Sequence, residues 1–161
     1  RPPACTILYA LTMPTVGGDT QFANQYLAYE GLSTGMKKML QGLRARHTGA
    51  GTARLAGKAA DQAPSSMHPV VRTHPETGRQ ALYVCKAFTE SFEDMTAAES
   101  APLLNWLFAQ SARYEYTFRH TWRPRDLVVW DNRCALHYAI HDHGDAKRLL
   151  HRCTVEGELP L

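Results

Sequence analysis

The chain of 161 residues lacks long hydrophobic runs and dense clusters of one charge. No apolar stretch approaches the roughly 20 residues of a membrane-spanning helix, so we expect no membrane span. The longest basic cluster is Lys37-Lys38, and because basic and aromatic side chains do not interleave, a net charge of +3 does not predict nucleic-acid binding. The chain opens Arg1-Pro2-Pro3, with neither Met nor a charged-then-apolar signal pattern, and we interpret it as a piece of a longer protein.

Closely spaced cysteine pairs are lacking as well. The four cysteines form no Cys-x-x-Cys motif and are spread over the whole length, which argues against a zinc site or a disulfide framework. We interpret them as reduced, mostly buried thiols of a cytoplasmic protein, while the sequence leaves a disulfide between Cys134 and Cys153 open. The cysteines are Cys5, Cys85, Cys134 and Cys153.

What is present is an ordinary globular composition, with 44% hydrophobic and 20% charged residues. A domain of about 150 residues buries roughly 70% of the surface that its unfolded chain exposes, so the chain can form a real core. The sequence shows no internal repeat and no sign of a second domain. We therefore predict a single domain over residues 1–161.

Periodicity in the first third of the chain predicts one strand and two helices. The strand spans 5–11 and ends before two turn signals. The first helix begins near Phe22, with apolar side chains spaced for one face as far as Leu32. Ser33 resembles a helix cap, and the second helix should run from there to about Arg46.

The middle of the chain predicts a loop and a hairpin. From 47 to 66 the composition changes to small and polar residues without a period, which we interpret as a mobile loop that could act as a lid. Residues 70–73 and 80–85 predict two paired strands across a turn that contains Pro and Gly. Thr96 and Glu99 have capping-box spacing and predict the start of a helix. Its buried face should consist of Leu103, Leu104, Trp106, Leu107 and Phe108. The remainder predicts strands at 114–122, at the buried run 127–130 and at 148–155.

Three side chains near the C-terminus could carry chemistry. His137 follows a turn-like Asp131-Asn132-Arg133, where a scaffold can present a side chain, although a lone histidine is more often satisfied by backbone hydrogen bonds. Arg148 and Arg152 are four residues apart, which on a strand places both on one face. Guanidinium groups bind carboxylates bidentately, so this face suits an anionic ligand. The alternative is that both arginines pair with acids such as Glu156 or Asp145.

Several motifs in the same order resemble the family of taurine dioxygenase and 2,4-dichlorophenoxyacetate dioxygenase, which are iron(II)- and 2-oxoglutarate-dependent oxygenases. The resemblance covers nearly the whole chain and is specific for the family rather than for a substrate. The motifs are Ile7-Leu8-Tyr9-Ala10, Gly17-Gly18-Asp19-Thr20, His68-Pro69-Val70-Val71-Arg72-Thr73-His74-Pro75, Gly78-Arg79-Gln80-Ala81-Leu82, Trp130-Asp131-Asn132-Arg133 and His137-Tyr138-Ala139.

The resemblance implies a mainly β fold with flanking helices, a double-stranded β-helix or jelly roll, of which this chain is the C-terminal portion. It also implies a role for five residues. His137 matches an iron-binding histidine, Arg148 the arginine that pairs with the far carboxylate of 2-oxoglutarate, and Thr20 the hydroxyl that binds the same carboxylate. Arg152 matches an arginine that binds an anionic substrate group or lies near the cosubstrate, and Phe88 an aromatic residue on the substrate side.

Iron in this family is held by two histidines and one carboxylate. The resemblance implies that the other histidine and the carboxylate form a His-x-Asp motif a few residues before Arg1, which this chain does not contain. His141-Asp142-His143 offers ligand atoms, but it matches a variable segment of the family, and we do not expect it to bind the metal.

The resemblance therefore predicts that the parent protein uses Fe(II), 2-oxoglutarate and dioxygen to hydroxylate a small, anionic organic substrate, with release of succinate and carbon dioxide. The alternative is a non-catalytic fragment or remnant that binds a dicarboxylate or a partner but holds no iron. If strand edges are left open by a missing segment, they favour self-association, so a homo-oligomer is also open.

Overall fold

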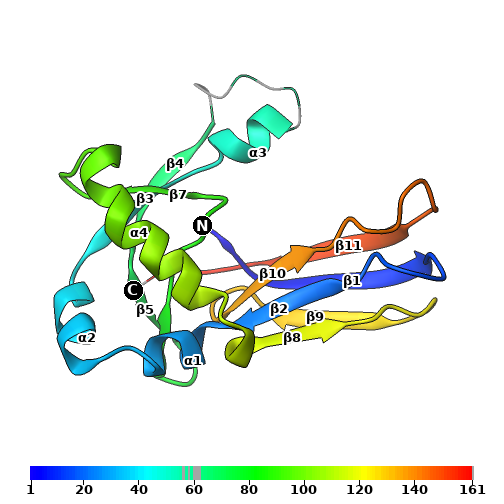
Figure 1. The fold of residues 1–161 in the computed structure, drawn as a ribbon, viewed down its shortest axis with the longest axis horizontal. Coiled ribbons are helices and arrows are strands. Elements are labelled where there is room, and N and C mark those ends of the chain that lie inside the picture. The colour runs from blue at the N-terminus through cyan, green and yellow to red at the C-terminus, as the bar shows by residue number, and fades with distance from the viewer. Residues whose placement is uncertain (56, 58, 60–62, 161) are drawn as a thin grey trace.

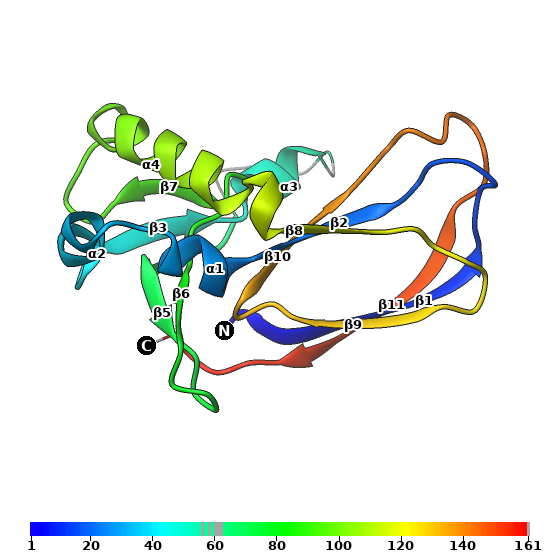
Figure 2. The ribbon, with the colours of Figure 1, turned by 60° about the horizontal axis from the view of Figure 1, so that its bottom comes forward.

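Two three-stranded antiparallel sheets face each other along one half of the molecule (Figures 1 and 2). The computed structural model describes residues 1–55, 57, 59 and 63–160. One sheet has the order β11-β1-β9 and the other β10-β2-β8. Their strands are β1 (Pro3–Thr12), β2 (Thr20–Asn24), β8 (Thr117–His120), β9 (Leu127–Asp131), β10 (Ala135–Ala139) and β11 (Leu149–Glu156).

Aromatic side chains fill the space between the two facing sheets. The Trp130 ring on β9 lies 5.2 Å from the Phe22 ring on β2 and 4.7 Å from the His137 ring on β10. Because side chains alternate along a strand, Leu127 and Val129 point to the opposite side of β9 and are 64% and 57% exposed. The prediction of a buried run at 127–130 is therefore wrong for these two residues and right for Trp130.

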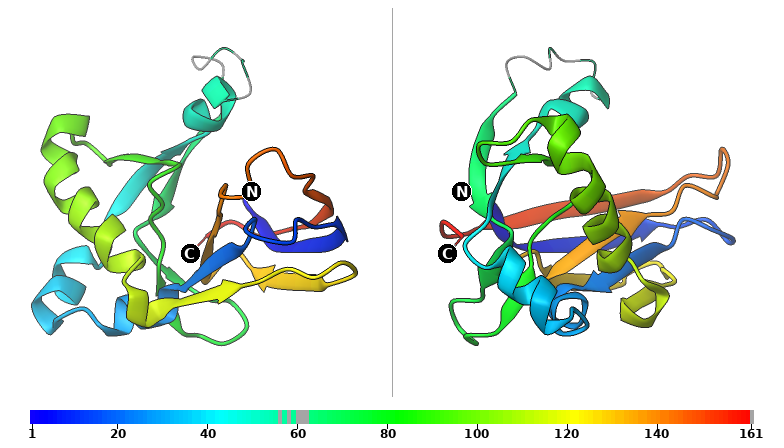
Figure 3. Two further views of the ribbon diagram at one scale, coloured as in Figure 1. Left: turned by 45° about the vertical axis from the view of Figure 1, so that its right-hand side comes forward. Right: turned by 60° about the vertical axis from the view of Figure 1, so that its left-hand side comes forward.

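The other half of the molecule combines a third sheet, a hairpin and the helices, and Figure 3 shows it to one side of the facing sheets. The third sheet has the order β4-β3-β7, and β5 pairs with β6 as predicted for the hairpin. The elements are β3 (Arg44–Thr48), β4 (Ser65–Pro69), β5 (Val71–Thr73), β6 (Gln80–Leu82), β7 (Thr89–Phe92), α1 (Gln25–Glu30), α2 (Thr34–Leu40), α3 (Ala50–Leu55), α4 (Ala97–Ser111) and the 3-10 turn η1 (Tyr114–Tyr116).

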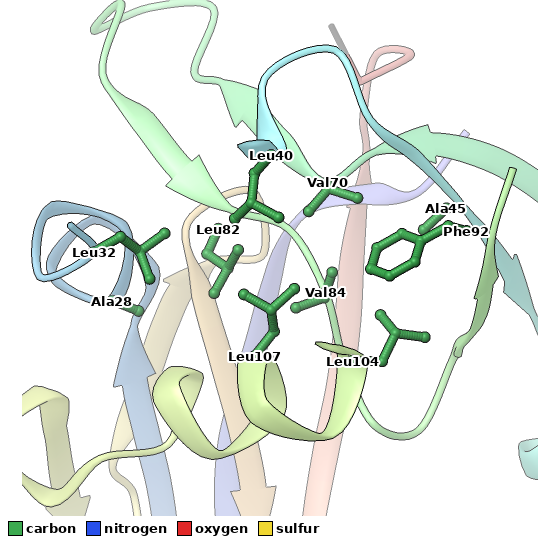
Figure 4. Close-up of a cluster of buried hydrophobic side chains, with 10 residues drawn as sticks. All are labelled: Ala28, Leu32, Leu40, Ala45, Val70, Leu82, Val84, Phe92, Leu104 and Leu107. Atoms are coloured by element: carbon green, nitrogen blue, oxygen red, sulfur yellow. The ribbon is translucent and has the colours of Figure 1, made fainter. Parts of the chain in front are cut away.

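The main hydrophobic core lies in this half, where α4 and α1 pack against the β5–β6 hairpin and the third sheet (Figure 4). Its side chains come from segments that are far apart in the sequence. They are Ala28, Leu32, Leu40, Ala45, Val70, Leu82, Val84, Phe92, Leu104 and Leu107. Trp106, which we expected on the buried face of α4, is 46% exposed, because the buried stripe of this helix follows Leu104 and Leu107.

The N-terminal helices are shorter than the sequence predicts. Phe22 lies in β2, and α1 begins only at Gln25, after Asn24 accepts hydrogen bonds from the backbone N–H groups of the first turn. Ser33 caps α2 as expected, but the helix ends at Leu40. Gly42 then adopts a positive φ of 80°, and the chain continues as β3 instead of helix.

The capping box of α4 is confirmed, since Thr96 and Glu99 satisfy each other's backbone N–H groups. The predicted loop over 47–66 is wrong in part, because its ends belong to β3 and β4 and α3 lies inside it. Residues 49, 57, 59, 63 and 64 belong to no helix or strand, and residues 56, 58 and 60–62 lie outside the described part of the chain.

No helix in the described residues is long and apolar enough to cross a membrane. The four cysteines are free, so the disulfide that the sequence left open is not formed. Cys153 is exposed and the other three are partly buried, so the expectation of mostly buried thiols holds only in part.

A cluster of rings joins the third sheet to the segment after β6. The His47 ring stacks on Tyr83 at 5.6 Å and meets the His68 ring edge-on at 5.1 Å. The Nε2 atom of His47 lies 3.2 Å from the hydroxyl of Thr89. Burial, together with the charge that His68 would carry, lowers the pKa of His47 from 6.5 to about 4.

This pKa predicts a specific loss of stability in acid. The unfolded chain binds a proton at His47 below pH 6.5, whereas the folded chain binds it only below about pH 4, so the contribution present above pH 6.5 is lost as the pH falls through 4. The loss should be about 3 kcal/mol in the free energy of unfolding. Urea unfolding between pH 7 and 4 measures it. His47→Gln should flatten this dependence, while the exposed control His151→Gln should leave it unchanged; equal slopes in the three proteins would contradict the assignment.

Candidate functional site

Thr20 and Arg148, which come from opposite ends of the chain, meet at one end of the facing sheets. Thr20 begins β2 and is only 1% exposed. Arg148 directly precedes β11, and its Nη2 atom lies 3.4 Å from the Thr20 hydroxyl oxygen. Its Nε–H donates to the carbonyl oxygen of Gly18 at 2.8 Å, which fixes the guanidinium beside the Gly17-Gly18 turn.

Arg148 has no acidic partner among the described residues. Burial lowers its pKa, so removing this group from water carries a cost that its neutral hydrogen-bond acceptors offset only in part. Arg148 pairs with neither Glu156 nor Asp145, which was the alternative. Glu156 instead lies 3.8 Å from Arg1. A half-buried guanidinium without a counter-ion is suited to bind an anion.

The Gly17-Gly18-Asp19 turn is held by side chains from two other segments. Asp19 accepts hydrogen bonds from Arg119 at 2.6 Å and from the Thr121 hydroxyl at 3.1 Å. The Gly18 N–H donates to Asp142 at 2.7 Å, and Asp142 also pairs with Arg119. The Asp142 carboxylate thus supports this turn.

The close packing of Gly17 against Asp142 makes this turn important for the stability of the fold. It has a φ of 79°, and a Cβ there would lie 2.6 Å from the Asp142 carboxylate and 2.7 Å from its backbone oxygen. Gly17→Ala should lower the free energy of unfolding by about 2 kcal/mol or more, because strain and a clash add up. Gly144→Ala is the matched control, since Gly144 also has a positive φ but open space around it. Thermal unfolding of both variants measures the difference, and equal losses would contradict the close packing at Gly17.

His137 lies within β10, opposite Phe22 of β2, rather than at the end of a turn as the sequence suggested. Its ring contacts Trp130 and makes no hydrogen bond to another described residue, so the reading of a histidine satisfied by the backbone is not supported. Partial burial lowers the pKa of His137, and the nearby charge of Arg152 lowers it further. The imidazole is therefore neutral near pH 7 and free to bind a metal ion.

An apolar pocket of about 530 Å³ lies beside His137. Its walls are formed by β2 and β10, by the segment 84–87 and by the C-terminal half of α4. Phe22, Leu136 and Phe108 supply apolar surface, and His137 is among the lining residues. Phe88 is 41% exposed and does not line the pocket. It directly follows Ala87, which ends the lining segment 84–87.

A second set of potential ligand atoms, in His74, Asp131 and Cys134, lies within 4.8 Å of one another. The backbone N–H groups of Glu76 and Thr77 both donate to Nδ1 of His74, so Nε2 carries the hydrogen and donates to Asp131 at 3.0 Å. A protonated Nε2 has no lone pair for a metal. We therefore assign this cluster a structural role.

Asp131 is the centre of that structural network. It receives two parallel hydrogen bonds from Arg133, which is 8% exposed and also pairs with Glu76 at 2.9 Å. Burial alone would raise the pKa of Asp131, but hydrogen bonds from Arg133 and His74 lower it to about 2. Glu158 extends the network by pairing with Arg133 and with the buried Arg72. These contacts join the hairpin, the β9–β10 turn and the C-terminal segment.

Trp122 is a residue of the site that sequence reasoning missed. Its indole is 5% exposed and donates from Nε1 to the Thr20 hydroxyl oxygen at 2.9 Å. The sequence signal was weak, because it consists only of a tryptophan after a strand, whose N–H needs an acceptor when it is buried. The acceptor lies 102 residues away.

Comparison with known proteins identifies the family of this chain. Residues 1–154 match the model of the family described as "Taurine catabolism dioxygenase TauD, TfdA family". The chain belongs to this family. Among its TauD/TfdA relatives is the alpha-ketoglutarate-dependent 2,4-dichlorophenoxyacetate dioxygenase of a Burkholderia species, which is 35% identical over 94% of this chain and 53% of its own length.

Solved structures of TauD/TfdA relatives share the fold. A taurine dioxygenase from Burkholderia xenovorans is 38% identical and superposes with a TM-score of 0.88, covering 99% of this chain and 54% of that one. AAD-2, solved with Mn(II) and N-oxalylglycine, is 27% identical with a TM-score of 0.90 and coverages of 99% and 65%. The predicted family and a mainly β fold with few helices are thereby confirmed. The chain spans about half the length of the curated relatives it matches.

Proposed function

We propose that the protein is an Fe(II)- and 2-oxoglutarate-dependent dioxygenase that hydroxylates a small organic anion, with release of succinate and carbon dioxide. The observation that carries the proposal is the Arg148 guanidinium, half-buried beside Thr20 without a counter-ion among the described residues. A dicarboxylate cosubstrate would supply that counter-ion through its distal carboxylate. The relatives named as alpha-ketoglutarate-dependent enzymes support the same ligand.

Arg148 and Thr20 would hold the distal carboxylate in two ways. The guanidinium supplies charge and two parallel N–H donors, and the Thr20 hydroxyl supplies a third donor from β2. Both groups are already in place, since Arg148 is fixed by the Gly18 carbonyl and Thr20 is buried in its strand. Little side-chain freedom would be lost on binding.

His137 is the metal ligand that this chain offers, because its ring is neutral and not hydrogen-bonded to a described residue. The family resemblance implies that a His-x-Asp segment preceding Arg1 completes the set of ligands. When bound, iron with 2-oxoglutarate supplies the oxidative decarboxylation that couples dioxygen to hydroxylation of a C–H bond. Trp130, packed against the His137 ring at 4.7 Å, would hold that ring in position.

The substrate would be an anion with an apolar body. The pocket beside His137 offers about 530 Å³ of mostly apolar space, and Arg152 supplies a positive charge close enough to act on His137. Phe88 stands next to the pocket and would contact the apolar part. We further propose that the two facing sheets form a jelly roll, that residues 1–161 belong to one domain and that the protein is cytoplasmic.

A non-catalytic dicarboxylate-binding protein is the second candidate. It is the alternative that the sequence leaves open, and one observation favours it: the cluster of His74, Asp131 and Cys134, whose ligand atoms lie within 4.8 Å of one another, is occupied by its own hydrogen bonds. This protein would bind 2-oxoglutarate through Arg148 and Thr20 and would not turn it over.

An anaerobic titration with Fe(II) and 2-oxoglutarate separates the two candidates. The chelate of the two gives a visible charge-transfer band when it forms in a protein site, and calorimetry on the same sample reports 2-oxoglutarate binding independently. The dioxygenase proposal predicts both signals, with the band lost and metal content reduced in His137→Ala. Binding without a band, with an intact mass matching 161 residues, favours the second candidate. Absence of 2-oxoglutarate binding would overturn both.

A further inference from the structure

The hydroxyl of Thr20 receives two hydrogen bonds and has one hydrogen left to give. Trp122 Nε1 donates to its oxygen at 2.9 Å, and Arg148 Nη2 approaches the same oxygen at 3.4 Å. A hydroxyl oxygen has two lone pairs and one hydrogen, so both lone pairs are then used. Among the described residues, no acceptor takes the Thr20 hydrogen. That hydrogen must point away from both donors, toward an external acceptor.

We propose that Trp122 is a positioning residue that fixes Thr20 as a hydrogen-bond donor to the distal carboxylate of the cosubstrate. This inference rests on the proposed function. Without the indole N–H, the Thr20 hydroxyl can rotate and present a lone pair to the ligand instead of its hydrogen. A carboxylate oxygen is repelled by a lone pair and attracted by an O–H group, so the orientation of this one hydroxyl decides the sign of the contact.

The indole is well placed for this role because its position does not depend on a ligand. Trp122 is 5% exposed, and the His120 ring packs edge-on against it at 4.7 Å and 88°. The turn that follows is closed by two hydrogen bonds between Arg123 and Asp126, of 2.8 and 3.1 Å. The donor to Thr20 is thus fixed by β8 and its turn before any anion arrives, as a preorganised site requires.

A double-mutant cycle tests the proposal through the affinity for 2-oxoglutarate, measured by calorimetry. Trp122→Phe keeps an aromatic ring and removes the N–H, and it should weaken binding about threefold to tenfold, the range of one hydrogen bond. Thr20→Val should weaken binding at least as much. In the Thr20→Val background, Trp122→Phe should have no further effect, because the hydroxyl that it orients is gone. Independent, additive losses would show that Trp122 only supports the fold and would overturn the proposal.

Two further readouts separate positioning from general damage. 2-Oxopentanoate lacks the distal carboxylate, so its binding should be equal in wild type and Trp122→Phe; an equal loss for both ligands would overturn the proposal. In the wild-type protein, the Trp122 indole N–H resonance should shift on addition of 2-oxoglutarate and not of 2-oxopentanoate, a measurement that needs no variant to fold. Trp106→Phe, on the exposed side of α4, is the matched control and should bind both ligands normally.

The outcomes also distinguish this inference from the function on which it rests. If wild type does not bind 2-oxoglutarate, the proposed function fails and the inference fails with it. If wild type binds and Thr20→Val weakens binding while Trp122→Phe does not, the function stands and the role of Trp122 is refuted.

Discussion

Arg148→Ala should weaken 2-oxoglutarate binding by about tenfold to a hundredfold, because a hydrogen-bonded charge pair is worth roughly 1.5–3 kcal/mol. Arg148 is the cation that touches Thr20, and burial has removed part of its hydration without giving it an acidic partner among the described residues. The variant should fold, since the side chain makes only neutral contacts, to Gly18 and Thr20. Calorimetric titration with 2-oxoglutarate measures the loss.

Two controls define what the loss means. Lys147→Ala removes the same charge one residue earlier, where the side chain is exposed, and should leave the affinity within about twofold because solvent screens exposed charges. Arg148→Lys keeps the charge and loses the two parallel donors, so its affinity should lie between those of wild type and Arg148→Ala. Unchanged affinity in Arg148→Ala would contradict the assignment of the dicarboxylate site.

Asp131→Ala should be strongly destabilising, with a loss of about 3 kcal/mol in the free energy of unfolding, because the buried Arg133 loses its bidentate partner and keeps only Glu76 and Glu158. Arg133 and His74, which are 8% and 4% exposed, both depend on this carboxylate. A typical domain is stable by about 5–15 kcal/mol, so such a loss is a large fraction of the total. Urea unfolding followed by circular dichroism measures it.

The low pKa of Asp131 predicts that the free energy of unfolding depends on pH. Its pKa is about 2 in the folded chain and 3.8 ordinarily, so its contribution is present above pH 3.8 and is lost as the pH falls through 2. This contribution is about 2 kcal/mol. The difference in stability between wild type and Asp131→Ala should shrink over this interval. Asp145→Ala, at an exposed site, should stay within about 0.5 kcal/mol of wild type.

A metal ion bound by His74, Asp131 and Cys134 would show itself in the thermal unfolding of the protein. If Co(II) raised the unfolding temperature of wild type but not of Cys134→Ala, the three ligand atoms would be a metal site and the structural assignment would be wrong. The structural assignment predicts that Co(II) changes the unfolding temperature of both proteins equally, because His74 Nε2 is already a donor to Asp131.

Part of the fold was predictable from local patterns, and the errors have local causes. The strands at 5–11 and 148–155, the hairpin and the capping box at Thr96 follow from alternation and spacing that the structure keeps, whereas β2, β3, β4, β7 and the 3-10 turn at 114–116 were not predicted. The second helix was extended too far because its apolar spacing continues past Leu40, whereas Gly42 turns the chain toward β3. Leu127 and Val129 were placed inside because an apolar run does not reveal which alternate positions face the other sheet.

The candidate site was predictable only through the family resemblance. Thr20 and Arg148 are 128 residues apart, and no periodicity or spacing brings them together, yet the structure places them in contact. Trp122 and the Asp131 network stayed hidden, because their roles depend on partners that only the folded chain brings near. The roles of His137, Thr20, Arg148, Arg152 and Phe88 stay predictions.

A crystal structure of the protein with 2-oxoglutarate bound is the most direct measurement of the central claim. We expect the distal carboxylate at Arg148, with oxygen atoms about 2.7–2.9 Å from the guanidinium nitrogens and within hydrogen-bonding distance of the Thr20 hydroxyl. Trp122 should still donate to Thr20 in that complex. A ligand bound elsewhere, with Arg148 and Thr20 unchanged and without an anion between them, would contradict the assignment of this site.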